Sequence, residues 1–197
     1  VKRHLYGNSV LDIGCGSTDF LKLIKPSYQI SGTEVNMQRV DYCNQALGQD
    51  AVSLGNLDRE LNFEDNSFDT VVCLEVLEHL EDPEKALKEL IRISRKRIIV
   101  TVPFDERIQY VLCIHCARYT PYSGHLHSFD KENIRGITPD NARIVEIELI
   151  CNRALNYLPV LRSVLFRLPI LITSNIDKIS NRIISSASWM MVVLDKD

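Results

Sequence analysis

The first half of the chain alternates short apolar runs with segments of helical periodicity, and this alternation restricts the fold more than any other feature. Short apolar runs bounded by turn residues are typical of buried strands in a parallel sheet. Strands that alternate with helices form βαβ units, so the pattern predicts a parallel sheet with helices on both faces. The predicted strands are Ser9–Ile13, Tyr28–Glu34, Ala51–Leu54, Thr70–Cys73 and Arg97–Val102, and the predicted helices are Thr18–Ile24, Asn36–Leu47 and Pro83–Arg95.

The rhythm changes after Pro103. Residues 104–129 are rich in Cys, His, Tyr and Pro without a clear period, which indicates an inserted Cys/His-rich loop. A strand is predicted at Ala142–Ile150, an apolar helical insertion or cap within 155–180 (clearest at Leu155–Ile172), and a last strand at Ser188–Leu194. We expect residues 1–197 to form a single α/β domain. Its core is a Rossmann-like, doubly wound, mostly parallel seven-stranded sheet with an antiparallel C-terminal edge strand.

Composition narrows the class of protein. Hydrophobic residues make up 45% of the 197 residues and charged residues 25%, the balance of an ordinary globular domain. A net charge of −3 and an isoelectric point near 6.0 argue against a general affinity for nucleic acid phosphates. We expect no signal peptide and no transmembrane segment. Four of the six cysteines are scattered singly through apparent core segments, a usage that predicts a cytoplasmic protein.

The strongest chemical signal lies in Val10–Thr18, which reads V-L-D-I-G-C-G-S-T. A strand carrying Asp12 leads into a turn with two glycines, which let the backbone bend sharply and let a ligand approach closely. The following helix start offers unpaired N–H groups to a carboxylate. The next strand ends in Glu34, about 20 residues on, where an acid accepts hydrogen bonds from ribose hydroxyls. The pattern indicates a nucleotide-like cofactor and, taken alone, also fits NAD.

Four segments carry a family resemblance: VLDIGCGS, GTEVN, FEDNSFDTVVCLEVLEHLEDPEKALKEL and RIIVTVPF. They resemble the class I S-adenosylmethionine-dependent methyltransferase superfamily, in the branch with a V-L-E-H-L segment after the fourth strand. The terminal SASWMMVVLDKD is similar to the last strand of that fold. The resemblance implies that Glu34 holds the ribose and that Asn56 and Leu57 contact adenine. The implied cofactor-binding residues are Asp12, Gly14, Cys15, Gly16, Glu34, Val35, Asn56, Leu57 and Cys73.

Two positions depart from the family pattern. Thr18 replaces the third glycine of the turn, and Asn56 replaces the acid that normally contacts adenine. An asparagine carbonyl oxygen also accepts a hydrogen bond from an adenine amino group, so cofactor binding is retained as an expectation.

Glu75, Glu78 and His79 form an E-x-x-E-H pattern. Residues three and four apart share a helix face, so these side chains are candidates for one divalent ion, Mg²⁺ or Mn²⁺. Small-RNA 2′-O-methyltransferases contain a similar arrangement completed by a distant histidine, and His127 matches that element. Such an ion lowers the pKa of a substrate hydroxyl. The other interpretation makes Glu75 and His79 catalytic residues that contact the acceptor without a metal.

A second metal hypothesis concerns the inserted loop. Cys113 and Cys116 form a C-x-x-C pair, and His125 and His127 follow on one side of an extended segment. Two thiolates and two imidazoles suit a tetrahedral structural zinc ion, which would order a loop with few other ordering interactions. The competing interpretation is two reduced cysteines packed in a loop and histidines at the substrate entrance. The two metal hypotheses compete for His127.

The acceptor is expected to be a small molecule, a lipid or a glycan precursor. The alternatives are a metal-assisted RNA 2′-O-methyltransferase, a catalytically silent methyltransferase-fold subunit that recruits a partner, and an NAD oxidoreductase. The apolar stretch Leu155–Ile172 suits a core or dimer contact, or a cap that touches a membrane surface through Arg162 and Arg167.

Overall fold

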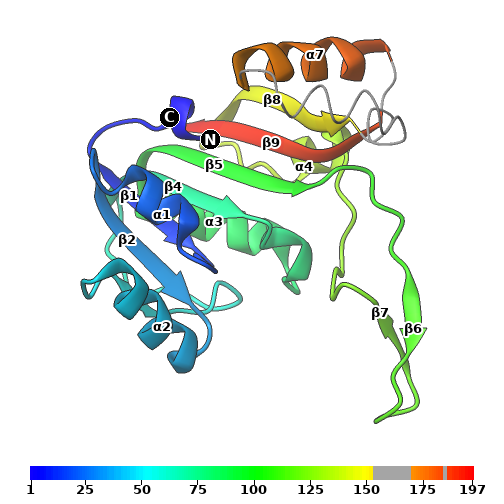
Figure 1. The fold of residues 1–197 in the computed structure, drawn as a ribbon, viewed down its shortest axis with the longest axis horizontal. Helices are drawn as coiled ribbons and strands as arrows, with labels where there is room; N and C mark the ends of the chain where they lie inside the picture. Colours follow the sequence, from blue (N-terminus) through cyan, green and yellow to red (C-terminus); the bar gives the residue numbers. More distant parts are fainter. Residues whose placement is uncertain (153–169, 184–185) are drawn as a thin grey trace.

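The computed structural model describes residues 1–152, 170–183 and 186–197, and its main sheet has seven strands in the order β3-β2-β1-β4-β5-β9-β8 (Figure 1). A separate two-stranded sheet pairs β6 with β7. The strands are β1 (Ser9–Ile13), β2 (Gln29–Glu34), β3 (Val52–Leu54), β4 (Phe68–Leu74), β5 (Ser94–Pro103), β6 (Tyr110–Leu112), β7 (Tyr119–Pro121), β8 (Ala142–Asn152) and β9 (Ala187–Lys196). The helices are η1 (Lys2–His4), α1 (Asp19–Ile24), α2 (Met37–Leu47), η2 (Leu77–His79), α3 (Pro83–Ile93), α4 (Lys131–Gly136) and α7 (Ile170–Ile183).

The predicted βαβ alternation is confirmed, and element ends differ by a few residues. Strands β1 to β5 pair in parallel, and helices α1 to α3 fall where the periodicity places them. Asp82 caps α3 by accepting a hydrogen bond from the Lys85 N–H, with Pro83 in the first turn. The helix ends at Ile93, two residues before the prediction, because Ser94 is already extended and begins β5.

The antiparallel edge is confirmed with a more specific order. β9 runs antiparallel to β5 and lies between β5 and β8, so β8 is the outermost strand. The sequence pattern missed α4, whose start at Asp130 is stabilised by a capping box with Asn133. Most of the predicted helix Leu155–Ile172 lies outside the described residues, and its last three residues belong to α7, which lies along β8 (Figure 1).

Alternating side chains of the strands fill two hydrophobic layers, one on each face of the sheet. Val10 and Val72 pack with residues of α1 and α2, whereas Leu11 and Val71 pack with residues of α3 and α4. Figure 1 shows these helix pairs on opposite faces of the strands. Within the described residues, none of the helices is both long enough and apolar enough to cross a membrane.

The parallel register determines where the polar residues meet. Ile13 pairs with Thr33 of β2 on one side and with Cys73 of β4 on the other. The carboxyl ends of these three strands therefore lie next to one another at one edge of the sheet. In doubly wound folds this edge is where ligands bind.

Lys196, near the end of β9, ties the last strand to the end of α3. Its ammonium group donates to the carbonyl oxygens of Ile91 (2.8 Å), Arg92 (3.2 Å) and Ser94 (3.1 Å), and to Asn66 Oδ1 (2.7 Å). A cation at a helix C-terminus satisfies orphan carbonyls and complements the helix dipole. Burial lowers the pKa of this amine.

We expect Lys196→Met to lower the free energy of unfolding by about 1–3 kcal/mol, because several partly buried carbonyls lose their donor. Chemical denaturation measures the change. The control Lys88→Met removes an exposed lysine of α3 that pairs only with Glu84 and should leave stability unchanged. Equal stability of the Lys196→Met variant and the parent protein would contradict this role.

Candidate functional site

The glycine turn after β1 is held against β2 by its own backbone. The N–H groups of Gly14 and Cys15 both donate to the Thr33 carbonyl oxygen, at 2.9 and 3.1 Å. Gly14 and Gly16 have φ angles of +67° and +54°, in the left-handed region that glycine adopts readily. A Cβ on Gly14 would lie 2.8 Å from Val76 Cγ2, because the segment after β4 passes over the turn.

Thr18 adopts a left-handed conformation, with φ +64° and ψ +10°. A β-branched residue is strained in this conformation, which explains why the family pattern has a glycine at this point of the turn. The side chain is fully buried and its hydroxyl donates to the Ser17 carbonyl oxygen at 2.6 Å. The departure noted in the sequence therefore leaves the turn intact and places the strain at the start of α1.

Asp12 and Glu34 form a pair of buried acids at the edge of the sheet. The Gly16 N–H donates to Glu34 Oε1 at 2.6 Å, so the carboxylate at the end of β2 points at the glycine turn. The Arg39 guanidinium of α2 lies 3.5 Å from Glu34 Oε2. Burial raises the pKa of Asp12 to about 8, and the nearby Glu34 charge adds to the rise. A cation bound here would stabilise the ionised Asp12.

The remaining predicted cofactor residues lie around this pair. Cys73, the next-to-last residue of β4, is fully buried, and Leu57 is also buried. Val35, which follows Glu34 directly, is exposed. The Asn56 carbonyl oxygen already accepts a hydrogen bond from the Asp58 N–H at 2.9 Å, and it has a second lone pair for another donor.

Cys43 and Arg39 were not singled out from the sequence, although both lie at this site. The Cys15 and Cys43 sulfur atoms are 4.0 Å apart, and the Cys43 thiol donates to the Gly16 carbonyl oxygen at 3.3 Å. Burial raises the pKa of both thiols. Arg39 and Cys43 lie three and seven residues after Asn36, the N-cap of α2, and therefore share one face of this helix. This spacing could have identified them as residues that face the glycine turn.

A second cluster lies beyond the end of β4. Glu75 has φ +57°, and its carboxylate accepts a hydrogen bond from the Trp189 indole N–H of β9. Glu78 is fully buried, and neither of its carboxylate oxygens has a hydrogen-bond partner in another of the described residues. Burial raises the pKa of Glu78 to about 7, and the Glu75 carboxylate adds to this rise.

Two histidines complete this cluster. The ligand atoms of Glu78, His79 and His125 all lie within 4.8 Å of one another. The two imidazole rings meet edge to face with centroids 4.8 Å apart. Outward from Glu78, His79 Nδ1 lies 3.2 Å from the Gly124 carbonyl oxygen and His125 Nδ1 contacts Glu106. We call Glu75, Glu78, His79 and His125 the Glu–His cluster.

The predicted divalent-ion set is corrected by this arrangement. His127 is turned away from the cluster, because its Nε2 atom lies 2.9 Å from the Leu80 carbonyl oxygen. The backbone N–H groups of Leu126 and His127 both donate to the Glu78 carbonyl oxygen, and this anchoring points His125 inward in place of His127. Glu75 is held by Trp189 and is not among the three converging groups.

The predicted zinc set of Cys113, Cys116, His125 and His127 is likewise not brought together. Both cysteines lie in the turn between β6 and β7, a hairpin that extends away from the main sheet (Figure 1). Across the described residues, neither cysteine belongs to a group of three converging ligands. The loop instead carries the histidines back toward η2, where His127 lies at the Leu80 carbonyl oxygen and His125 contacts Glu106.

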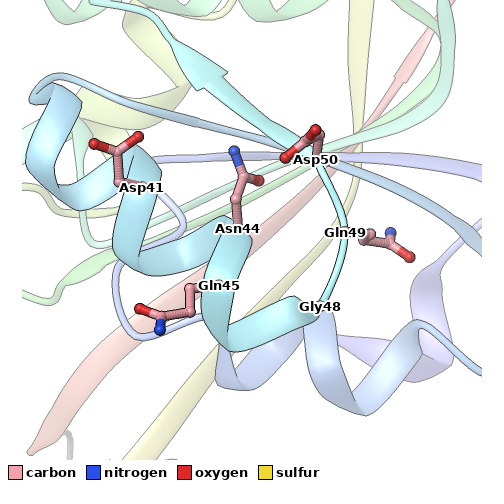
Figure 2. Close-up of a pocket in the computed structure, with 6 residues that line it drawn as sticks. All are labelled: Asp41, Asn44, Gln45, Gly48, Gln49 and Asp50. Atoms are coloured by element: carbon pink, nitrogen blue, oxygen red, sulfur yellow. The ribbon is translucent and has the colours of Figure 1, made fainter.

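Figure 2 shows a polar depression at the end of α2, lined by Asp41, Asn44, Gln45, Gly48, Gln49 and Asp50. It lies beside the start of β3, at the amino ends of the parallel strands, whereas the glycine turn follows the carboxyl end of β1. The Asn44 side chain is already occupied there, since it bonds to the N–H and carbonyl groups of Val52. The depression has no part in the site.

Comparison with known proteins finds similarity to several methyltransferases. The model of a methyltransferase domain family matches residues 11–100. A ubiquinone biosynthesis O-methyltransferase of Paraburkholderia phymatum is 34% identical over 98 residues, covering 43% of this chain and 39% of that protein. The chain covers well under two thirds of the first curated relatives it matches, 36% of one and 39% of another.

Solved structures share the fold at low identity. An S-adenosylmethionine-dependent methyltransferase of Mesorhizobium loti superposes with a TM-score of 0.64 at 14% identity, covering 98% of this chain and 93% of that one. A chain of the Haloferax volcanii complex between the Trm112 methyltransferase activator and a methyltransferase gives 0.62 at 18% identity, with coverage of 96% and 82%.

The glycine turn provides a test of the packing of Val76. Gly14→Ala should destabilise the protein by more than the cost of about 1–2 kcal/mol for a left-handed alanine, because its methyl group also meets Val76. The matched control is Gly48→Ala, with the same φ of +67° and no atom within 4 Å of the added Cβ. Denaturation curves compare the two. Equal losses would show that Val76 does not press on the turn.

Proposed function

We propose that the chain is a class I S-adenosylmethionine-dependent methyltransferase, which transfers the methyl group of this cofactor to a small-molecule, lipid or glycan acceptor. The observation that carries the proposal is the hydrogen bond from the Gly16 N–H to Glu34, which joins the glycine turn to the acid at the end of β2. The family resemblance implies that the glycine turn holds the methionine part of the cofactor and that Glu34 holds its ribose.

The charges of the edge suit this cofactor. S-adenosylmethionine carries a cationic sulfonium and an ammonium group, and Asp12 and Glu34 supply two carboxylates where the strands end. We place the ammonium group near Asp12, whose ionised form it stabilises, and the ribose hydroxyls on Glu34. Glu34 then exchanges its bond from Gly16 for bonds from the ribose. Val35, Asn56 and Leu57 would line the adenine side.

The Glu–His cluster is the proposed acceptor site. Cys73 is the point where β4 passes the cofactor, and Glu75 and His79 follow within six residues. When bound, S-adenosylmethionine would supply its methyl group to a nucleophilic atom of the acceptor, whose proton would pass to solvent, and would leave as S-adenosylhomocysteine. Such a transfer needs mainly alignment of the two reactants, so Glu75 and His79 act by positioning the acceptor.

The acceptor class rests on two observations. The net charge of −3 disfavours a nucleic acid, and one relative is named for O-methylation in ubiquinone biosynthesis. A cytoplasmic location, inferred from the cysteine usage, is part of the same proposal.

Calorimetry with S-adenosylhomocysteine tests the cofactor site. Glu34→Ala should weaken binding by about 1–3 kcal/mol, because a buried charge-assisted hydrogen bond is lost. The control is Glu132→Ala, at an exposed position of α4, and this variant should bind the ligand as the parent protein does. NAD should not compete. Unchanged affinity in Glu34→Ala, or displacement by NAD, would contradict the assignment.

A second candidate function is metal-assisted methyl transfer to a hydroxyl. It is favoured by Glu78, whose buried carboxylate lacks partners and lies within 4.8 Å of His79 and His125. One carboxylate and two imidazoles suit Mn²⁺ better than Mg²⁺, which prefers oxygen ligands. The ion would lower the pKa of the acceptor hydroxyl. The three side chains would hold the ion, and Glu75 would stay on Trp189.

Mn²⁺ binding separates the two mechanisms. If the ion binds, calorimetry should detect one Mn²⁺ per chain, lost in Glu78→Ala and in His125→Ala. His127→Ala is the control and should retain Mn²⁺, because that ring faces the Leu80 carbonyl. Absence of Mn²⁺ binding, together with full methyl transfer in a chelator, would leave alignment alone as the mechanism. If His127→Ala loses Mn²⁺ and His125→Ala keeps it, the ligand set expected from the sequence, with His127 in place of His125, would be supported instead.

A further inference from the structure

The hairpin of β6 and β7 stands apart from the rest of the molecule. Its strands have three residues each, paired as Tyr110–Pro121, Val111–Thr120 and Leu112–Tyr119, and they make no pairing with the main sheet. Figure 1 shows the hairpin extending beyond the end of β5. A two-stranded hairpin without further packing is marginally stable in water, and the described strands of the main sheet do not pair with this one.

The hairpin is also unusually apolar for an exposed segment. Its large exposed hydrophobic side chains are Tyr110, Val111, Leu112, Ile114, Tyr119 and Tyr122. Ile114, at the turn, is 89% exposed. Contiguous exposed apolar groups of this kind mark a surface that another molecule covers.

The turn of the hairpin presents two sulfur atoms together. The Cys113 N–H donates to the Arg118 carbonyl oxygen at 2.8 Å, and the Ala117 N–H donates to the Cys113 carbonyl oxygen at 2.9 Å, which closes the turn. Cys116 lies one residue before Ala117, so both cysteines of the C-x-x-C pair are held within this one tight turn. Two cysteine side chains in one tight turn supply half of a tetrahedral thiolate site.

The other half is not supplied by the described part of this chain. Its groups of three converging ligands are Cys15–Glu34–Cys43, Glu78–His79–His125 and His4–Glu146–Glu148, and none includes the hairpin. Residues 153–169 and 184–185, which complete the 197, contain no Cys, His, Asp or Glu. His125 is engaged with Glu106, and His127 with the Leu80 carbonyl oxygen directly after η2.

We propose that the hairpin tips of two copies of this chain share one zinc ion, bound by Cys113 and Cys116 of each copy. Four thiolates complete the tetrahedral coordination that structural zinc requires, and four thiol protons are released to solvent. The zinc–tetrathiolate unit carries a formal charge of −2, which Arg118 beside the turn of each copy offsets. The apolar side chains of the two hairpins cover one another in the same contact. This inference does not depend on the methyl-transfer proposal.

The full chain is titrated with Zn²⁺ after chelation and reduction, and its mass is followed by light scattering. The mass should double from the 22.5 kDa of one chain, with a midpoint at one zinc per two chains, and return to that of one chain with a chelator. X-ray absorption should show four sulfur ligands at about 2.3 Å. Cys113→Ser and Cys116→Ser should each abolish both zinc binding and doubling.

Cys151→Ser is the matched control, because Cys151 is an exposed cysteine at the end of β8 and should not affect the doubling. One zinc per chain with only two sulfur ligands would overturn the proposal, as would a dimer that persists in the Cys113→Ser variant. Failure of the reduced protein to bind zinc, while a thiol reagent finds both Cys113 and Cys116 free, would overturn it as well.

Discussion

The parallel pairing of β1 between β2 and β4 is the constraint on which the rest of this structure depends. It fixes Ile13 opposite both Thr33 and Cys73, so three strand ends meet at one edge. The glycine turn bonds back to the Thr33 carbonyl, and Glu34 bonds forward to the turn. A shift of register by one residue would turn Asp12 to the opposite face, because strand side chains alternate. The cofactor edge therefore depends on the same contacts that build the core.

The fold and the cofactor edge could be predicted because their signals are local. Apolar runs such as Ser9–Ile13 are buried on both faces, which gives a continuous pattern, and the turn needs residues that tolerate positive φ. Thr18 shows the limit of that rule: a buried threonine holds the left-handed position with a hydrogen bond to the Ser17 carbonyl oxygen. The helix ends were less predictable, since Ser94 extends β5 directly from α3.

The Glu–His cluster and the hairpin depend on contacts between distant segments, and local patterns do not specify these. The sequence placed His127 with Glu78, whereas two backbone bonds to the Glu78 carbonyl orient the segment so that His125 points inward. The same segment carries both histidines away from Cys113 and Cys116. A C-x-x-C pair followed by two histidines predicted one zinc site, but the hairpin separates the halves. Spacing indicates candidate ligand types in each segment and does not specify which distant residues they meet.

The pH dependence of S-adenosylhomocysteine binding tests most directly whether Asp12 and Glu34 form a site for the ammonium group and the ribose of the cofactor, both of which this product retains. Asp12 has a pKa of about 8, so it is protonated in the free protein at pH 6, and binding an ammonium group favours its ionised form. Affinity should rise by up to about tenfold per unit between pH 6 and 8, with release of a proton on binding. Affinity that falls with rising pH, as expected for an anionic dinucleotide, or that does not change, would contradict the account.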